Sequence, residues 1–291
     1  MAATASARRF LMCPPTYFDV AYAINPWMRP GTGVDPGRAG RQWDALRATL
    51  SGLGHTVVEM PAAQGLPDLV FAANGGIVIG DRAMAPRFRF AQRAEEAEHF
   101  AVALAELGYA DVRRPIHLNE GEGDFLLAGE VLLAGNGFRS DTAAAAEVAD
   151  YFDLPVVELT LVDARFYHLD TALAVLDADT VAYFPGAFDA RSNAALAERF
   201  PEAILAEEGD AAVLGLNMIS DGGSVVLCAA ADRLAAAVAD HGYRVLPVEY
   251  DEFAKAGGGP KCCVLRLQDR PEEAGPGRGY GALGNTADPR G

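Results

Sequence analysis

Apolar, β-prone runs recur along most of the chain, and each follows a short polar motif. The motifs are FAANGG (71–76), EGEGD (120–124), HLDT (168–171), LNMISDGG (216–223) and GGGPKCC (257–263). Their spacing of roughly 45–50 residues is typical of a repeat architecture. In each motif, a polar or reactive residue stands near the start of an apolar run. If the units are arranged around an axis, these side chains converge on one spot.

Segments with apolar residues at helical spacing lie between the motifs. Helices are predicted over 37–54, 90–108, 141–152, 189–200 and 230–242; the first two end in Gly, and each of the last three has an Asp near its start. A β-like run follows most of these helices. Hairpin turns are predicted at 80–81, 128–130, 177–179 and 221–223. One unit therefore reads as polar motif, strand, turn, strand, helix, strand.

A single ββαβ unit cannot cover its own apolar sheet face, so the units are expected to pack together. Four units lie between residues 55 and 256, and the fifth is split between ARRFLMCPP and KCCVLRL near the two chain ends. Pairing of these two strands would close a ring and remove exposed sheet edges. An open doubly wound sheet is the alternative, but no G-x-G-x-x-G follows a first strand and the hairpins imply antiparallel pairing.

No linker interrupts the pattern, so residues 9–267 are predicted to form a single domain. Residues 268–291 are rich in Gly, Pro and charge, and we expect a disordered tail there. The chain is 51% apolar and 22% charged, as in a soluble globular protein, and no apolar run is long enough to cross a bilayer. The N-terminus has two arginines but only a very short apolar segment, so it does not resemble a secretory signal.

The charge and the cysteines narrow the function classes. A net charge of −16 argues against a nucleic-acid partner, because phosphate contacts need clusters of Lys and Arg. The acidic excess could help to attract a small cation. The four cysteines include no C-x-x-C pair, which argues against a zinc ribbon or a thioredoxin-type site and favours a reduced, cytoplasmic protein.

Cys262 is the candidate nucleophile. It follows GGGPK, where glycines let the backbone approach a ligand and Lys261 could lower a nearby thiol pKa. The alternative is a small apolar filler, the common role of a buried Cys. If KCCVLRL is a strand, Cys263 points to the opposite face, so only one of the two thiols can face a site.

His168 and Asp170 stand two residues apart in FYHLDTALAVL, so on a strand their side chains would share one face. Histidine titrates near neutral pH, which suits a general acid and base. For an isolated His, a hydrogen-bonded core position is the commoner outcome. A His and an Asp that project together into a cleft are harder to explain by packing alone.

Glu120 and Glu122 lie among glycines, in a setting that fits either a ligand-facing acid or a solvated loop charge; the motif lacks the ligand spacing of an EF-hand. Asn74 in AANGG could be a turn residue. Arg139 in GNGFRSD could hold a carboxylate by a bidentate fork or lie exposed in a loop. Asn25, in the NPW segment, could belong to a lid or to a turn anchored by a buried Trp.

Taken together, the acid–glycine motif, H-x-D and the C-terminal glycine-rich Cys, in this order, resemble the guanidino-group-modifying enzymes of the pentein superfamily. These include arginine deiminase, dimethylarginine dimethylaminohydrolase, arginine dihydrolase and the amidinotransferases. The similarity extends over residues 9–267. It implies an α/β fold, a five-bladed propeller of ββαβ repeats closed by the N- and C-terminal strands.

The resemblance also implies roles for individual residues. Cys262 matches the nucleophile, His168 the general acid/base, and Glu120 the carboxylate that grips the guanidinium. The usual acid-Gly-Gly-Asp motif is one residue longer here, so Glu122 remains an alternative to Glu120. The implied substrate-binding residues are Asp170, Asn74, Arg139, Arg87 in MAPRFRF, and Asn25.

The implied activity is hydrolysis of the guanidino group of free or N-methylated arginine through a covalent Cys intermediate, without metal or organic cofactor. Dimethylarginine would give citrulline and an amine. Deiminases and methylarginine hydrolases usually carry Asp at the position of Asn74. The Asn at this position and the NPW motif resemble the arginine dihydrolases, which give ornithine, ammonia and CO2. An amidinotransferase and a non-catalytic pentein binding module are further alternatives. The expected partner is a small guanidino molecule, with no nucleic acid or membrane, and a homodimer is the assembly to test.

Overall fold

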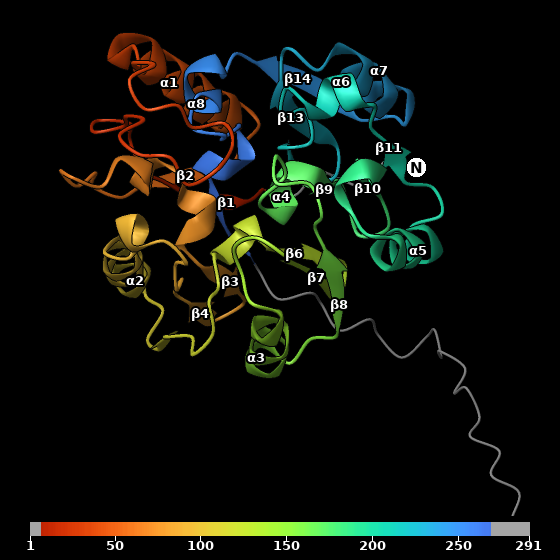
Figure 1. Cartoon of the computed structure of the whole chain (residues 1–291), viewed down its shortest axis with the longest axis horizontal. Coiled ribbons are helices and arrows are strands. Elements are labelled where there is room, and N and C mark those ends of the chain that lie inside the picture. The colour runs from red at the N-terminus through yellow and green to blue at the C-terminus, as the bar shows by residue number, and fades with distance from the viewer. Residues whose placement is uncertain (1–6, 269–291) are drawn as a thin grey trace, which may run out of the picture.

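Five small sheets form a ring in the computed structural model, which describes residues 7–268 (Figure 1). Each sheet has three strands, in the orders β15-β1-β2, β3-β4-β5, β6-β7-β8, β9-β10-β11 and β12-β13-β14. The strands are β1 (Arg9–Met12), β2 (Thr56–Glu59), β3 (Ile77–Ile79), β4 (Arg82–Met84), β5 (Val112–Arg113), β6 (Phe125–Ala128), β7 (Val131–Asn136), β8 (Val156–Thr160), β9 (Leu173–Val175), β10 (Val181–Tyr183), β11 (Ile204–Leu205), β12 (Ile219–Ser220), β13 (Ser224–Cys228), β14 (Arg244–Val248) and β15 (Leu265–Leu267). The predicted five ββαβ units are confirmed.

The split fifth unit closes the ring as predicted. Strand β1 pairs antiparallel with β15, with Arg9 opposite Leu267, and parallel with β2. The other four sheets repeat this arrangement, since an antiparallel hairpin is followed by a helical crossover to a parallel third strand. All four predicted hairpin turns join such antiparallel pairs. The first sheet is therefore built from both ends of the described chain.

The helices lie outside the strands, except for the short helix α4, which lies near the centre of the ring (Figure 1). They are α1 (Pro36–Gly52), α2 (Glu96–Glu106), α3 (Thr142–Phe152), α4 (Leu169–Ala172), α5 (Ala190–Arg199), α6 (Glu208–Ala211), α7 (Asp232–Asp240) and α8 (Asp251–Ala254). Two of the longer helices begin at a capping aspartate: Asp35 accepts from Arg38 N at 2.9 Å, and Asp189 accepts from Ser192 N at 2.7 Å.

Helix α2 is shorter than predicted. Residues 91–93 form a separate 3-10 turn, and the α-helix begins only at Glu96. Arg93 is buried and turns inward to pair with Glu96 at 2.8 Å and with Asn74 Oδ1 at 2.7 Å. Because these inward contacts require a different local backbone, the first turn of the predicted helix is interrupted.

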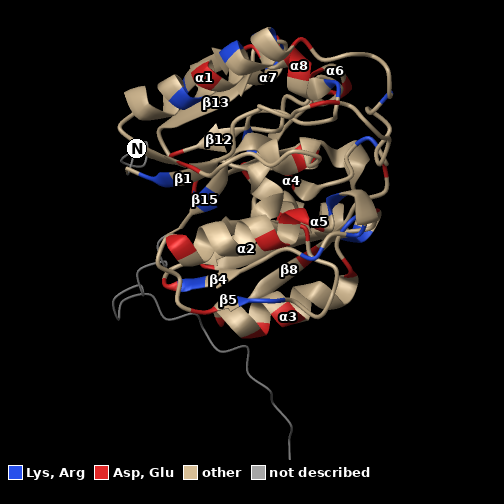
Figure 2. Ribbon diagram, turned by 90° about the vertical axis from the view of Figure 1, so that its left-hand side faces the viewer, with Lys and Arg blue, Asp and Glu red and all other residues tan. Residues whose placement is uncertain are grey.

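Acidic residues occur on several outer helices, including α2, α3 and α8, in the view of Figure 2. Within residues 7–268, no helix is both long and apolar enough to cross a membrane. The single domain over 9–267 stays a prediction, and the predicted tail lies, apart from Gln268, outside the described residues.

Candidate active site

Four of the polar motifs form short turns. Three of these turns directly precede the first strand of a hairpin, and the fourth precedes β15. The 3-10 turns Ala72–Gly75, Gly121–Gly123 and Lys261–Cys263 precede β3, β6 and β15, and helix α4 precedes β9. The turns approach one another closely: a Cβ on Gly123 would collide with the side chain of Asn74 and lie 3.1 Å from the ring of His168. Glycine in the acid–glycine motif therefore permits the motifs to meet at the hub, the centre of the ring of sheets.

Two local expectations are wrong. Cys262 and Cys263 do not alternate across a strand, because both lie in a 3-10 turn, both are buried, and β15 begins only at Leu265. His168 precedes the first turn of α4 and Asp170 lies within it, so the two do not share a strand face. The turn directs these two side chains to different partners.

His168 and Glu120 form a buried pair. Nε2 of His168 lies 2.7 Å from Oε2 of Glu120, and the same oxygen accepts from Arg139 at 2.8 Å. Burial alone would favour the neutral acid, but Arg139 and then His168 hold the pKa of Glu120 well below its ordinary range. Glu120 is therefore an ionised carboxylate that is 0% exposed.

Glu122 faces other partners. It accepts hydrogen bonds from Lys261 Nζ at 2.9 Å, from the backbone N of Arg266 at 2.9 Å and from Gln268 Nε2 at 3.0 Å. The two glutamates thus separate, and Glu120 is the one that joins His168.

The Cys262 thiol is held by two side chains. Nδ2 of Asn217 donates to Sγ at 3.1 Å, Oδ1 of Asn217 accepts from the Cys262 backbone N at 2.9 Å, and Oδ2 of Asp170 lies 3.6 Å from Sγ. Asn217 is 0% exposed and also donates to the Asp170 carbonyl at 3.0 Å. Asn217 is not among the predicted site residues, although it stands in the fourth polar motif, where the repeat pattern could have marked it.

Burial, and after it the charge of Asp170, raise the pKa of the Cys262 thiol well above its ordinary range. Lys261 lowers the pKa of the thiol, as expected, but burial and the charge of Asp170 outweigh this effect. Burial also raises the pKa of Asp170 to about 7, with Lys261 opposing the shift. Oδ1 of Asp170 has no hydrogen-bond partner among the described residues. A bound cation would supply the missing partner and favour both anions.

Asn74 lies within the same buried network. Its Nδ2 donates to the carbonyl of Glu120 at 3.4 Å, and its Oδ1 accepts from Arg93. Arg93, which sequence reasoning missed, also contacts Glu96 and Asp68. Burial raises the pKa of Glu96 to about 7, although Arg93 opposes the shift. Asn74 is therefore more than a turn residue.

Asn25 anchors its loop to the segment that leads to Cys262. Its Nδ2 donates to the carbonyl of Ala256 at 3.0 Å, and its Oδ1 accepts from Trp27 N at 2.9 Å. Nε1 of Trp27 donates to the carbonyl of Arg165 at 2.8 Å. The NPW segment therefore links the segments that precede the His168 and Cys262 motifs, and its role as a lid stays a prediction.

Of the two predicted carboxylate-binding arginines, only Arg139 joins the cluster. Its guanidinium lies 4.9 Å from the ring centre of Phe90 and 4.6 Å from that of Tyr167, and donates to the carbonyl of Ile24 at 3.0 Å. Arg87 is exposed and donates to the carbonyl of Ile116. The backbone N–H and carbonyl of Arg87 both form hydrogen bonds with the backbone of Asn119, and the side chain points outward.

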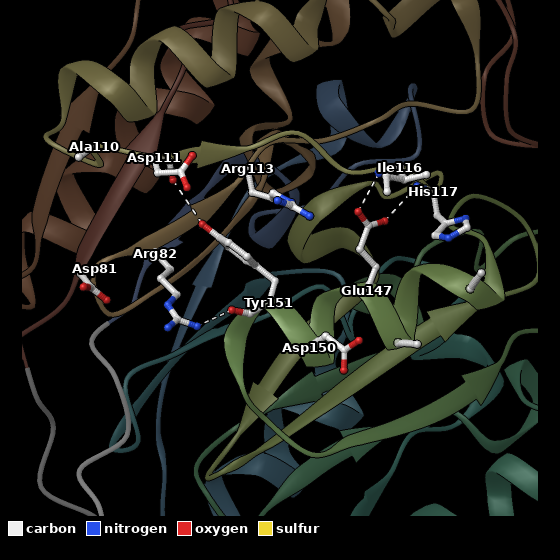
Figure 3. Close-up of a pocket in the computed structure, with 12 residues that line it drawn as sticks. Asp81, Arg82, Ala110, Asp111, Arg113, Ile116, His117, Glu147, Asp150 and Tyr151 are labelled. Atoms are coloured by element: carbon white, nitrogen blue, oxygen red, sulfur yellow. Dashed lines mark hydrogen bonds between the residues drawn. The ribbon is translucent and has the colours of Figure 1, made fainter.

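A surface groove of about 1020 Å³ lies elsewhere, between α3 and the β4–β5 segment (Figure 3). Its polar groups hold these elements together. Arg82 donates to the Tyr151 carbonyl at 2.6 Å, and Glu147 accepts from the backbone N of Ile116 at 2.8 Å and of His117 at 3.0 Å. None of the candidate site residues lines this groove.

No family model matches the chain. It is 48% identical over 264 residues to an N(G),N(G)-dimethylarginine dimethylaminohydrolase of Mycobacterium tuberculosis, covering 91% of this chain and 87% of that protein. It is 40% identical to the bifunctional arginine dihydrolase/ornithine cyclodeaminase AgrE of Nostoc sp., covering 90% of this chain but only 38% of that protein. The product-bound N-terminal domain of ArgZ, a cyanobacterial arginine dihydrolase, superposes with a TM-score of 0.88 at 36% identity, covering 91% of this chain and 99% of that domain.

Proposed function

Because the chain belongs to the pentein family of dimethylarginine dimethylaminohydrolases and arginine dihydrolases, we propose that it hydrolyses the guanidino group of free or N-methylated arginine through a covalent bond to Cys262. The observation that carries this proposal is the arrangement of groups at the hub. A buried thiol adjoins Asp170, and His168, two residues before Asp170 in the chain, pairs with an ionised Glu120. Thiol, imidazole and two acids are the groups that this reaction needs.

A guanidinium is planar, cationic and poorly electrophilic, so its central carbon must be held in place for attack. Asp170 offers one carboxylate oxygen without a partner, and Glu120 offers a second carboxylate. In the proposed complex these acids orient the cation, and Asn74 adds its amide. The positive charge lowers the pKa of Cys262 and so offsets the effect of burial.

The thiol proton passes to His168 as Sγ attacks the guanidino carbon. His168 then protonates the leaving nitrogen, the C–N bond breaks, and ammonia or an alkylamine departs from an amidino-thioether. His168 next takes a proton from water, and the hydroxide attacks the same carbon. The C–S bond breaks, the ureido product leaves, and the proton on His168 returns to the thiolate. Arg139 and Asn25 are assigned to the amino-acid end of the substrate, whereas the outward-facing Arg87 is the least supported of the carried-over residues.

Arginine dihydrolase activity is a second candidate, favoured by one feature of the site. Asn74 stands where deiminases and methylarginine hydrolases usually carry Asp, and its amide contacts the Glu120 carbonyl. A dihydrolase would carry the ureido product through a second hydrolysis to ornithine, ammonia and CO2.

Product analysis separates these candidates. The protein is incubated with arginine or with asymmetric dimethylarginine, and citrulline, ornithine, ammonia and dimethylamine are quantified. Citrulline with dimethylamine identifies a methylarginine hydrolase, whereas ornithine with two equivalents of ammonia per arginine identifies a dihydrolase. If neither citrulline nor ornithine forms from either substrate, the proposal is overturned.

Two variants assign the roles. Cys262→Ala should lower turnover by more than about 10^4-fold while far-UV and near-UV circular dichroism stay unchanged. His168→Ala should also lower turnover. If the reaction of this variant stops after the covalent step, intact mass spectrometry of the enzyme–substrate mixture shows the adduct on the protein. Normal turnover of either variant would remove that residue from the mechanism.

A further inference from the structure

One buried carboxylate beside the site has no role in the proposed reaction. Asp124 ends the acid–glycine motif EGEGD, directly before β6, and its exposed fraction is 1%. Its backbone N donates to the carbonyl of Gly121 at 3.1 Å, and its carbonyl accepts from Gly135 N at 2.7 Å. The backbone of Asp124 is therefore tied both to the turn of its own motif and to β7.

Both oxygens of this carboxylate accept hydrogen bonds from two other segments of the chain. Oδ1 accepts from the backbone N of Leu169 at 3.1 Å, and Oδ2 accepts from Ser140 Oγ at 2.7 Å and from Ser140 N at 3.2 Å. All three partners are donors, which suits an ionised carboxylate, because it can only accept. Burial raises the pKa of Asp124 to about 6, so the group is mostly ionised at neutral pH.

The partners of this carboxylate adjoin three residues of the candidate site. Leu169 directly follows His168, and Ser140 directly follows Arg139. Ser140 Oγ also accepts from the backbone N of Glu120 at 3.0 Å. The carboxylate therefore holds the backbone beside His168 and beside Arg139 directly, and it reaches the backbone of Glu120 through one hydroxyl group.

Close packing restricts the carboxylate to this place. A Cβ on Gly135 would lie 3.1 Å from Asp124 Oδ1 and 2.7 Å from the Cβ of Leu169. The pair that depends on this packing is short, since Oε2 of Glu120 lies 2.7 Å from Nε2 of His168. A displacement of about 1 Å at a reacting group can lower a rate about 100-fold, so the groups that fix this pair bear on the rate.

We propose that Asp124, together with Ser140, is a positioning residue that sets the geometry of the Glu120–His168 pair for proton transfer. The inference rests on the proposed function, because it takes His168 as the acid and base of guanidino hydrolysis. The carboxylate acts through the backbone of Leu169 and the hydroxyl of Ser140, not by contact with the substrate. The competing explanation is that these hydrogen bonds only stabilise the fold.

Asp124→Asn tests the proposal, because it keeps the size of the side chain but replaces one accepting oxygen by an NH2 group. Whichever way the amide turns, its NH2 group faces a backbone N–H, either of Leu169 or of Ser140. We expect kcat to fall about 100-fold and KM to change less than about threefold, because proton transfer depends more steeply on geometry than attraction of the substrate cation does.

Asp221→Asn is the matched control. Asp221 is also buried, with an exposed fraction of 4%, and its side chain also accepts from two backbone N–H groups, those of Gly223 and Ser224. Its turn between β12 and β13 holds no candidate site residue. Both variants should lose stability in urea unfolding, but Asp221→Asn should keep kcat within about twofold. An equal loss of kcat in the two folded variants would overturn the proposal.

Ser140 supplies a second pair of variants, which replaces the first if Asp124→Asn does not fold. Ser140→Ala removes the hydroxyl between Asp124 and Glu120 and should lower kcat about tenfold, whereas Ser140→Thr keeps a hydroxyl and should restore most of the activity. The double variant Asp124→Asn/Ser140→Ala should be no slower than Asp124→Asn alone, because both changes break one chain of hydrogen bonds. Losses that multiply in the double variant would contradict the proposal.

A measurement without substrate distinguishes failure of this proposal from failure of the proposed function. Because an ionised Glu120 can only accept, Nε2 of His168 carries the proton of their hydrogen bond, and a downfield 1H NMR resonance of this N–H is expected, assigned by its loss in His168→Ala. The resonance should shift or disappear in Asp124→Asn and stay unchanged in Asp221→Asn. If the unchanged protein forms neither citrulline nor ornithine, the proposed function fails. An unmoved resonance in Asp124→Asn would overturn the positioning role, whatever the protein turns over.

Discussion

Glu120 and Glu122 stand two residues apart in one motif and are both buried, yet they serve two different regions of the hub. Glu120 shares one oxygen between His168 and Arg139, on the side of the Cys262 thiol. Glu122 receives hydrogen bonds from Lys261, Arg266 N and Gln268 and so ties the 3-10 turn of Cys262 to β15. Glu120 thus adjoins the proposed acid/base His168, whereas Glu122 uses its acceptors to hold the fold. Burial of an acid among glycines therefore does not by itself distinguish a reactive carboxylate from a structural one.

The largest expected effect is the difference between replacing Glu120 and replacing Glu122 by glutamine. Glu120→Gln is expected to lower kcat/KM by about 10^3-fold, because the charge that balances His168 and the substrate cation is lost. Glu122→Gln should act mainly on stability, by about 3 kcal/mol, since Lys261 loses its buried partner. Steady-state kinetics and urea unfolding of both variants measure this. Equal losses of kcat/KM in the two folded variants would contradict the division.

Asn217→Ala should have the next largest effect. Without its amide, the Cys262 thiolate loses a donor at 3.1 Å, and we expect kcat to fall about 10- to 100-fold. The pH profile of thiol alkylation should move to higher pH, which a merely structural residue would not cause. Asn193→Ala is the control, because Asn193 donates only to backbone carbonyls around α5. An unmoved alkylation profile in Asn217→Ala would exclude this positioning role.

The smallest expected effect is a change in the pH dependence of stability. The pKa of Asp170 is raised to about 7 in the folded protein, so between pH 4 and pH 7 the folded state binds a proton that the unfolded state has released. Stability therefore falls as pH rises through this window. Asp170→Asn should make the free energy of unfolding less dependent on pH there.

Asp163→Asn should leave that slope in place. Arg165 holds the pKa of Asp163 below its ordinary range, so the stability that Asp163 contributes is lost only at more acidic pH. Urea unfolding at several pH values compares the three proteins. A slope that is as steep in Asp170→Asn as in the unchanged protein would show that other buried acids, such as Glu96, dominate the window.

Much of the architecture could be predicted from local pattern. Apolar runs, hairpin turns and helix stops recur along the chain, and the split fifth unit follows from the need to pair two otherwise exposed edges. The exact setting of the reactive residues could not be predicted. Residues with high β propensity surround Cys262 and His168, but the backbone forms 3-10 and helical turns there, where four turns approach one another at the hub.

The sequence by itself determined the repeat, the closure of the ring, and the set of motifs whose polar residues meet at its centre, because these depend on periodicity and on the order of residue types. Only the tertiary structure gave Glu120 and Glu122 different partners, brought Asn217 to the thiol and turned Arg87 outward. The physical reason is that these contacts join residues far apart in the chain, so burial, charge and hydrogen-bond partners are defined only after the five sheets have packed together.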